Sequence, residues 1–188
     1  MPIPKNAKKV FQGEIFSVYQ WKQKMFDGSF KIFERVKRQD TVIVIATVKN
    51  KVVILKQRQP GTSWYYSTPA GRMDIPGEKP FAAAKRELLE ETGMTSKDFF
   101  LWKKHSSTGK LSYTVYFYIA RNCTKVAEQK LDAGEKIKVE LISFDDYLKL
   151  SDDNKAGIRS FMHQSLIDMY KARLDKKYKN YLKKTLFG

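Results

Sequence analysis

The sequence predicts a fold of the α/β class, with a mixed β-sheet held between helices. Three observations indicate this fold: short apolar runs typical of buried strands, an alternating amino-terminal stretch, and segments with apolar residues at helical spacing. Strands and helices do not alternate regularly along the chain, as they would in a doubly wound parallel sheet. The 188 residues suit one domain with a small appendage, and 42% apolar residues are enough for a buried core.

The amino-terminal stretch, residues 10–38, alternates apolar and polar side chains on both sides of Asp27-Gly28. Alternation is typical of half-buried strands, and Asp-Gly between two such runs favours a hairpin turn. We therefore expect an antiparallel strand extension over residues 1–40 and a main domain over residues 41–188. Further strands are predicted from apolar or alternating runs at residues 41–47, 51–55, 113–120 and 137–143.

Helices are indicated by their boundaries as much as by their apolar spacing. Residues 80–92 begin with a proline, which suits the first turn, and end before Gly93, which suits the left-handed position after a helix. A longer carboxy-terminal helix is expected over about residues 155–184, where apolar side chains recur at helical spacing. Residues 60–76, which are rich in Pro, Gly, Ser and Thr, are predicted to form a loop.

The net charge of +16 favours polyanionic partners or anionic substrates through long-range attraction, with general solubility as the alternative reading. No zinc-finger or aromatic RNA-binding pattern accompanies the charge. The single cysteine, Cys123, cannot form an intrachain disulfide framework. Because the sequence also has no apolar run near 18 residues and no secretory signal at its start, we expect a cytoplasmic location without membrane contact.

Three glutamates share one face of the predicted helix over residues 80–92. Glu87, Glu90 and Glu91 are spaced i, i+3 and i+4, and like charges at that spacing oppose one another by roughly 0.2–0.5 kcal/mol per pair. They also lie near the helix carboxy-terminus, where the helix dipole disfavours anions. Clustered carboxylates suit hard ions, so the pattern predicts a Mg²⁺ or Mn²⁺ site. A solvated acidic face, with Arg86 paired to Glu90, explains the helix alone equally well.

The residues around this helix resemble the Nudix box, G-x5-E-x7-R-E-U-x-E-E-x-G-U, where U is a large aliphatic residue. Glu78 is followed by seven residues and then by Arg86 to Met94, which meet every specified position in that half. Gly71 and Glu78 are separated by six residues rather than five, and the extra residue falls in a loop, where insertions are tolerated. The resemblance implies the Nudix fold and metal-dependent hydrolysis of a pyrophosphate bond.

The resemblance also implies roles for individual residues of the box. Arg86 is expected to orient a glutamate of the box, and Arg86 and Glu90 are both catalytic candidates. The expected metal ligands are Glu87 and Glu91 as the principal pair, supported in ligation or charge by Glu78, Glu90 and the carbonyl of Ala70.

Beyond the box, residues 10–150 resemble the ADP-ribose and nucleoside-diphosphate-sugar pyrophosphatases. FQGEIFSVYQ and DGSFKIFERV look like the amino-terminal strands of that branch, which often cross to a partner subunit and help to build a dimeric site. Trp21 and Phe33 on these strands are candidate adenine-stacking residues, with core packing as the alternative. VVILKQRQP resembles a strand followed by a substrate-contacting arginine, which is Arg58 here; a solvated charge is the alternative.

The segment LDAGEKIKVELISFDDYLKL resembles the loop, strand and short helix that follow in the same branch. That loop commonly supplies a catalytic glutamate. Glu135 is the candidate and Asp132 the second choice, with a surface acid as the alternative reading of Glu135. Ser143 followed by Asp146 resembles a capping box at the start of the short helix.

Two departures from the branch bear on the substrate. Ser67 stands two residues before Pro69, where the branch usually has glutamate, and Tyr113 stands where a loop acid would contact sugar hydroxyls. We expect a homodimer that hydrolyses ADP-ribose or a related nucleoside diphosphate sugar to a nucleoside monophosphate and a sugar phosphate. An RNA 5′-end pyrophosphohydrolase is the runner-up, suggested by the charge. A non-catalytic Nudix-fold ligand sensor ranks last, because the box glutamates all remain.

Overall fold

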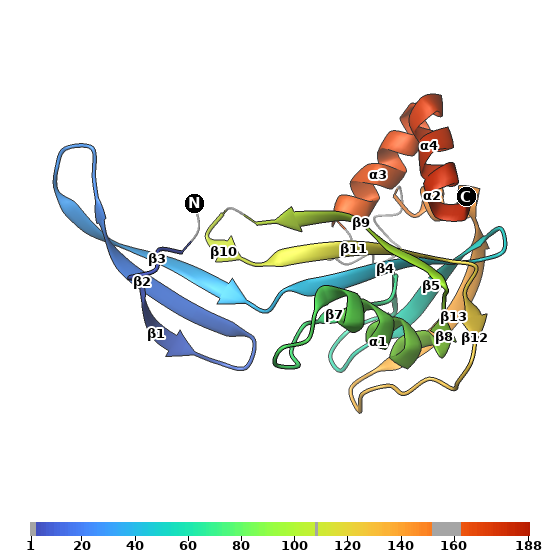
Figure 1. The fold of residues 1–188 in the computed structure, drawn as a ribbon, viewed down its shortest axis with the longest axis horizontal. Coiled ribbons are helices and arrows are strands. Elements are labelled where there is room, and N and C mark those ends of the chain that lie inside the picture. Colours follow the sequence, from blue (N-terminus) through green and yellow to red (C-terminus); the bar gives the residue numbers. More distant parts are fainter. Residues whose placement is uncertain (1–2, 108, 152–162) are drawn as a thin grey trace.

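The computed structural model describes residues 3–107, 109–151 and 163–188 (Figure 1). Within these ranges the strands are β1 (Lys8–Gln12), β2 (Phe16–Lys24), β3 (Phe30–Arg38), β4 (Thr41–Val48), β5 (Lys51–Arg58), β6 (Tyr65–Ser67), β7 (Ala70–Arg72), β8 (Met94–Thr95), β9 (Asp98–Ser106), β10 (Leu111–Ser112), β11 (Thr114–Arg121), β12 (Thr124–Lys125) and β13 (Lys136–Ser143). The helices are α1 (Pro80–Thr92), α2 (Phe144–Lys149), α3 (His163–Leu174) and α4 (Lys176–Phe187).

The central sheet is mixed and lies between helices, as the sequence predicts. Its strand order is β13-β5-β4-β11-β9, with β6 paired to β5 and β7 paired to β4. The pairing of β4 with β11 is parallel and the other pairings are antiparallel. No helix of the described ranges is long and apolar enough to cross a membrane.

Alternation along the central strands produces two apolar cores, one on each face of the sheet. Val44 and Val53 are fully buried against Leu88 of α1. Ile45 and Ile54 point to the other face and pack in a cluster with Met169 of α3, to which α2 and α4 also contribute. Burying each such side chain contributes roughly 1.5–3 kcal/mol. The helix α1 is thereby fixed on the face opposite α2, α3 and α4 (Figure 1).

The amino-terminal strands form a second sheet, of order β1-β2-β3-β10, that projects from the central sheet (Figure 1). β2 and β3 pair antiparallel along their whole length, and the expected turn contains Gly28 at φ 84°, in the region that favours glycine. The junction is held by Asp40, whose carboxylate accepts a hydrogen bond from the backbone N–H of Thr114 at 2.8 Å. The hairpin is confirmed, whereas the division of the chain into two units at residue 40 stays a prediction.

Two helix boundaries agree closely with the sequence. The helix α1 ends at Gly93, which has φ 70° and whose N–H donates to the carbonyl of Leu89 at 2.7 Å. Ser143 is the N-cap of α2, and its hydroxyl accepts a hydrogen bond from the N–H of Asp146 at 3.1 Å.

Two expectations are wrong. Residues 60–76 are not all loop, because β6 and β7 find partners in β5 and β4. The expected helix over about residues 155–184 is two helices in its described part. Asp175 is extended (φ −123°, ψ 113°), and its carboxylate accepts hydrogen bonds from the N–H groups of Lys177 and Tyr178 and so starts α4. The expected start of that helix, residues 155–162, lies outside the described residues.

Candidate active site

The two expected principal ligands lie against the short strand β7. Glu91 is 5% exposed, and its Oε2 accepts a hydrogen bond from the backbone N–H of Ala70 at 2.9 Å. Glu87 lies against Gly71, where an added Cβ would be 2.0 Å from the carboxyl carbon of Glu87. The sequence Ala70-Gly71 therefore provides a hydrogen-bond donor for one carboxylate and room for the other.

Burial and mutual repulsion make these carboxylates costly to ionise. Burial raises the pKa of Glu91 well above its usual range, and the charges of Glu87, Glu135 and Glu90 raise it further. Burial also raises the pKa of Glu87 to about 7, although the Arg86 guanidinium acts in the opposite direction. A cation among these carboxylates would favour their charged forms and offset both effects.

Arg86 joins the loop before α1 to the helix itself. Its Nε and Nη2 donate to the carboxylate of Glu78 at 3.0 and 2.9 Å, and its Nη1 donates to Glu87 at 2.7 Å and to Glu90 at 3.1 Å. A planar guanidinium can make such a paired contact with one carboxylate and still serve two others. The structure thus brings together Arg86 and three of the expected carboxylates.

The donor set fits a hard divalent cation in kind, because it consists of carboxylate oxygens beside the main chain of Ala70 at the start of β7. In residues 3–107, 109–151 and 163–188, no three His, Cys, Asp or Glu side chains already converge as ligands of one ion. The hydrogen bonds to Arg86 and to the Ala70 N–H account for the present orientation of the carboxylates. The residues that would hold an ion are Glu87 and Glu91, with Glu78, Glu90 and Ala70 in support.

Glu135 reaches the same group of carboxylates from the loop before β13. It is partly buried, and this burial is the main cause that raises the pKa of its carboxyl. The charge of Glu90 is among the further causes that raise it. A tight turn holds it: the N–H of Glu135 donates to the carbonyl of Asp132 at 2.9 Å. Asp132 is itself exposed. Of the two acids that the sequence offers in this loop, the structure therefore places Glu135 within electrostatic range of Glu90 and Glu91.

Arg58 ends β5 beside this loop. Its guanidinium carbon lies 5.3 Å from the ring centroid of Trp64, and a cavity of about 310 Å³ opens between residues 58–62 and the side of the loop formed by Ala133, Gly134 and Lys136. Lys136 is the cross-strand partner of Arg58 in the β13–β5 register, so two cations flank that cavity. No local pattern in the sequence singles out Lys136, since its position opposite Arg58 depends on a strand pairing that spans 78 residues.

Trp21 and Phe33 are not brought to the carboxylates within one chain. They are cross-strand partners on β2 and β3, with ring centroids 6.1 Å apart, and these strands project away from the central sheet (Figure 1). Trp21 is 7% exposed and Phe33 is 38% exposed. Trp21 therefore packs as the core alternative expects, and Phe33 keeps a partly open face.

Ser67 and Tyr113, the two residues that depart from the branch pattern, both contact other side chains of the protein. The side-chain amide of Gln57 donates to the hydroxyl of Ser67, across the β5–β6 pair. The ring of Tyr113 lies under the guanidinium of Arg38, at 4.8 Å from the ring centroid. Neither position therefore presents a carboxylate to a ligand.

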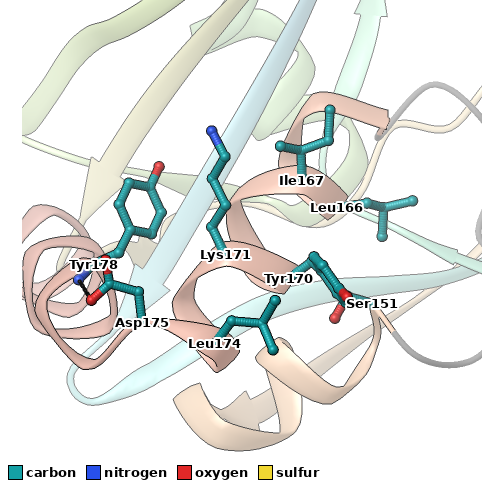
Figure 2. Close-up of a pocket in the computed structure, with 8 residues that line it drawn as sticks. All are labelled: Ser151, Leu166, Ile167, Tyr170, Lys171, Leu174, Asp175 and Tyr178. Carbon is teal, nitrogen blue, oxygen red and sulfur yellow. Dashed lines mark hydrogen bonds between the residues drawn. The ribbon is translucent and has the colours of Figure 1, made fainter.

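A larger cavity, of about 570 Å³, lies among α3, α4 and the end of α2, on the face of the sheet opposite α1 (Figure 2). Its lining includes the apolar side chains of Leu166, Tyr170 and Leu174, and the carboxylate of Asp175, which also lines it, is engaged as the N-cap of α4. Among the described residues that line this cavity there is no cluster of acids like that at α1, so the chemistry is assigned to α1 and its surroundings.

Comparison with known proteins agrees with this geometry. The family model of the NUDIX domain matches residues 37–164, which is more than half of the chain. The chain belongs to the Nudix hydrolase family. The Nudix box accordingly comprises β7, the loop that follows it, and α1.

Three relatives illustrate the range of similarity. The chain is 31% identical over 147 residues to an ADP-ribose pyrophosphatase of Bacillus subtilis (strain 168), covering 76% of this chain and 79% of the relative. It is 28% identical over 148 residues to a methanol dehydrogenase activator of Bacillus methanolicus, covering 77% and 80%. It is 26% identical over 103 residues to the ADP compounds hydrolase NudE of Escherichia coli (strain K12), covering 54% and 55%.

The fold is also that of a solved Nudix structure. The crystal structure of an ADP compounds hydrolase superposes with a TM-score of 0.72 and covers 92% of this chain and 94% of the other. At 18% sequence identity, this likeness supports the Nudix fold, and the roles of individual residues rest on the geometry described above.

Proposed function

We propose that this Nudix hydrolase cleaves the pyrophosphate bond of ADP-ribose or a related nucleoside diphosphate sugar, with Mg²⁺ or Mn²⁺ as cofactor. The products are a nucleoside monophosphate and a sugar phosphate. The observation that carries the proposal is the set of box glutamates gathered by Arg86 and β7 in one chain. Similarity to an ADP-ribose pyrophosphatase over 76% of the chain supports the choice of substrate class.

The residues divide the chemical work between the box and the loop before β13. A divalent cation supplies positive charge to the diphosphate oxygens and makes an attacking water easier to deprotonate. Arg86 keeps the box carboxylates turned toward one another, and the N–H of Ala70 holds Glu91. Glu135 is the group that we propose takes the proton from the attacking water. Arg58 stabilises the negative charge on the two phosphate groups as the bond between them is cleaved.

The contacts that Ser67 and Tyr113 make within the protein support a related nucleotide sugar as a substrate alongside ADP-ribose itself. In the resembling branch, acids at these two positions are usual, and the acid of the loop contacts sugar hydroxyls. Here a Gln57–Ser67 hydrogen bond and an Arg38–Tyr113 stack occupy them. We therefore propose that the sugar half is recognised differently from the usual pattern.

We propose that the active form is a homodimer built through residues 10–40. Several large apolar side chains of this extension are exposed, among them Phe11 (57%), Phe30 (64%) and Ile32 (60%). A concentration of apolar surface on a projecting sheet favours a protein partner. Light scattering at micromolar concentration tests this, and a monomer would contradict it.

The substrate proposal is tested with a panel in the presence of Mg²⁺: ADP-ribose, ADP-, UDP- and GDP-hexoses, NADH, dinucleoside polyphosphates and 5′-triphosphate RNA, with the products identified. We expect a nucleoside monophosphate and a sugar phosphate from the nucleotide sugars. Glu91→Gln is expected to abolish turnover while the melting temperature is kept, because it removes a ligand charge that is costly to bury. Full activity in that variant would remove Glu91 from the metal site.

Two other functions give different results on the same panel. Activity confined to RNA, lost steeply with added salt, would favour RNA 5′-end hydrolysis. Against it, the basic helices α3 and α4 lie on the face opposite α1 (Figure 1). Silence on every substrate would favour a ligand sensor or regulator. Against that stands the presence of Glu78, Glu87, Glu90 and Glu91 in one cluster around Arg86 and β7.

A further inference from the structure

The last carbonyls of α1 obtain their hydrogen-bond partners from a segment far along the chain, residues 126–130. A helix leaves its final carbonyl groups without partners inside the helix. Here the N–H of Lys130 donates to the carbonyl of Glu90 at 2.8 Å. The side-chain amide of Gln129 donates to the carbonyl of Glu91 at 2.5 Å. The main chain of two box glutamates is therefore fixed by the segment that leads to Glu135.

Gly93 lets this segment approach. The N–H groups of Val126 and Ala127 both donate to the carbonyl of Gly93, at 2.8 and 3.1 Å. A Cβ at residue 93 would lie 2.0 Å from the carbonyl oxygen of Ala127, and the backbone there has φ 70°. Unlike a flexible side chain, a backbone carbonyl cannot turn aside, so a side chain at residue 93 would push the segment off the helix. The glycine at this position of the box is thus needed for the docked segment as well as for the helix end.

Glu135 lies between two anchors. On its carboxy-terminal side, β13 starts at Lys136 and pairs with β5 through Arg58. On its amino-terminal side, Lys130 and Gln129 hold the segment by their hydrogen bonds to the last carbonyls of α1. Between the anchors, Ala133 and Gly134 are exposed, and the hydrogen bond from the Glu135 N–H to the Asp132 carbonyl closes the turn. With Lys136 fixed in β13, the other end of this turn is placed relative to Glu90 and Glu91 by the contacts of residues 129 and 130 with α1.

We infer that Gln129 is a positioning residue for hydrolysis: its side-chain amide locks the loop that carries Glu135 onto the end of the catalytic helix. It is partly buried, in contrast to its exposed neighbours Glu128 and Lys130, which fits a side chain with a structural partner. The effect on catalysis runs through Glu135, so the inference rests on the proposed function. Loss of the Gln129 hydrogen bond should allow the Glu135 carboxylate to move from its position. A misplacement of about 1 Å at a reacting group can cost on the order of 100-fold in rate.

The test is the variant Gln129→Met, which keeps the length of the side chain and removes the donor. Glu128→Gln is the matched control, since Glu128 is next to Gln129 and 89% exposed, and its ion pair with Lys125 at 2.8 Å is a surface pair that contributes little to stability. Each variant is made in the wild-type chain and in the Glu135→Gln chain. For all of them kcat and KM are measured on the substrate that the panel selects, and hydrogen exchange is followed over residues 126–135.

We expect Gln129→Met to lower kcat roughly 10- to 100-fold with KM kept within about twofold. In the Glu135→Gln background the same change should have no further effect, because the two residues act on one step. Exchange of the amides at residues 126–130 should be faster by on the order of fivefold, as loss of one hydrogen bond allows. The Glu128→Gln control should match the wild type in every measurement.

Three results with the Gln129→Met change would overturn the inference: an unchanged kcat, unchanged exchange, or an equal loss of kcat in both backgrounds. The last would mean that Gln129 acts on α1 and not through Glu135. A Glu135→Gln chain with wild-type kcat would also sink it, while leaving the proposed hydrolysis standing. Inactivity of the wild type on every substrate is a different result. It would refute the proposed hydrolysis. Hydrogen exchange would then test only whether the Gln129 side chain holds residues 126–130 against α1.

Discussion

Gly71→Ala should inactivate the enzyme without unfolding it. The added Cβ would lie 2.0 Å from the carboxyl carbon and 2.0 and 2.3 Å from the two carboxylate oxygens of Glu87. Van der Waals contact requires about 3.4 Å or more, so the carboxylate must move by more than about 1 Å. The atoms in the way are the end of a flexible side chain, which can rotate where a backbone group could not. The clash should therefore displace the Glu87 carboxylate without unfolding the protein.

The magnitude follows from this displacement. Moving a reacting or metal-holding group by about 1 Å can cost on the order of 100-fold in rate, so we expect a kcat of roughly one-hundredth of the wild-type value. The backbone of Gly71 does not have positive φ, so alanine brings no conformational strain. The free energy of unfolding should change by less than about 1 kcal/mol, mainly through the Arg86–Glu87 contact at 2.7 Å.

The assay compares kcat, Mn²⁺ affinity by calorimetry and urea unfolding for Gly71→Ala. Gly109→Ala is the control for stability, since its backbone also lacks positive φ and a Cβ there would have no neighbour within 4 Å. Wild-type kcat and metal affinity in Gly71→Ala would refute the reasoning, because Glu87 would then work equally well from a displaced position. A large loss of stability would refute it in another way, by showing that the carboxylate cannot move.

Further predictions concern the parts of the fold around the site. Asp168→Asn should lower stability by roughly 2–3 kcal/mol in urea unfolding, because Asp168 is 4% exposed, pairs with Lys103 and accepts a hydrogen bond from the hydroxyl of Tyr178 at 2.6 Å. The kcat of Asp168→Asn should not change, because Asp168 lies on the α3 side of the sheet, away from α1. A lowered kcat would contradict this separation of Asp168 from the active site. Burial raises the pKa of the Cys123 thiol from 9.0 to about 11, so at pH 8 its thiolate fraction is about a hundredfold lower than for an ordinary thiol. Alkylation at pH 8 should therefore be far slower in the native protein than in urea, and equal rates would show that the thiol is accessible.

Features with local causes could be predicted from the sequence. The helix α1 has a proline at its start, Gly93 at its end and buried alanines on one face, so its bounds follow from a few neighbouring residues. The hairpin at Asp27-Gly28 and the cap at Ser143 are equally local. The glutamate cluster could be found for the same reason, since helical spacing alone places Glu87, Glu90 and Glu91 on one face.

Features that depend on distant partners could not be predicted. Apolar spacing continues through Asp175, so the pattern alone did not indicate that its side chain caps α4 and divides the predicted helix. The strand β9 was not predicted; its apolar residues are followed by Lys103, Lys104 and His105, and its pairing with β11 holds it in the sheet. The contact of Gln129 with α1 joins residues 38 positions apart and leaves no pattern in the sequence.

The extra residue in the Nudix box is tolerated because the box is defined by two anchors and not by the length of the loop between them. At one anchor, Gly71 is held in β7 by pairing with β4. At the other, Glu78 is held by the paired hydrogen bonds from Arg86 at 3.0 and 2.9 Å. Residues 74–77 between them are exposed, so one more residue lengthens a solvent-facing turn without moving either end. The spacing that departs from the family pattern therefore lies where the structure needs it least.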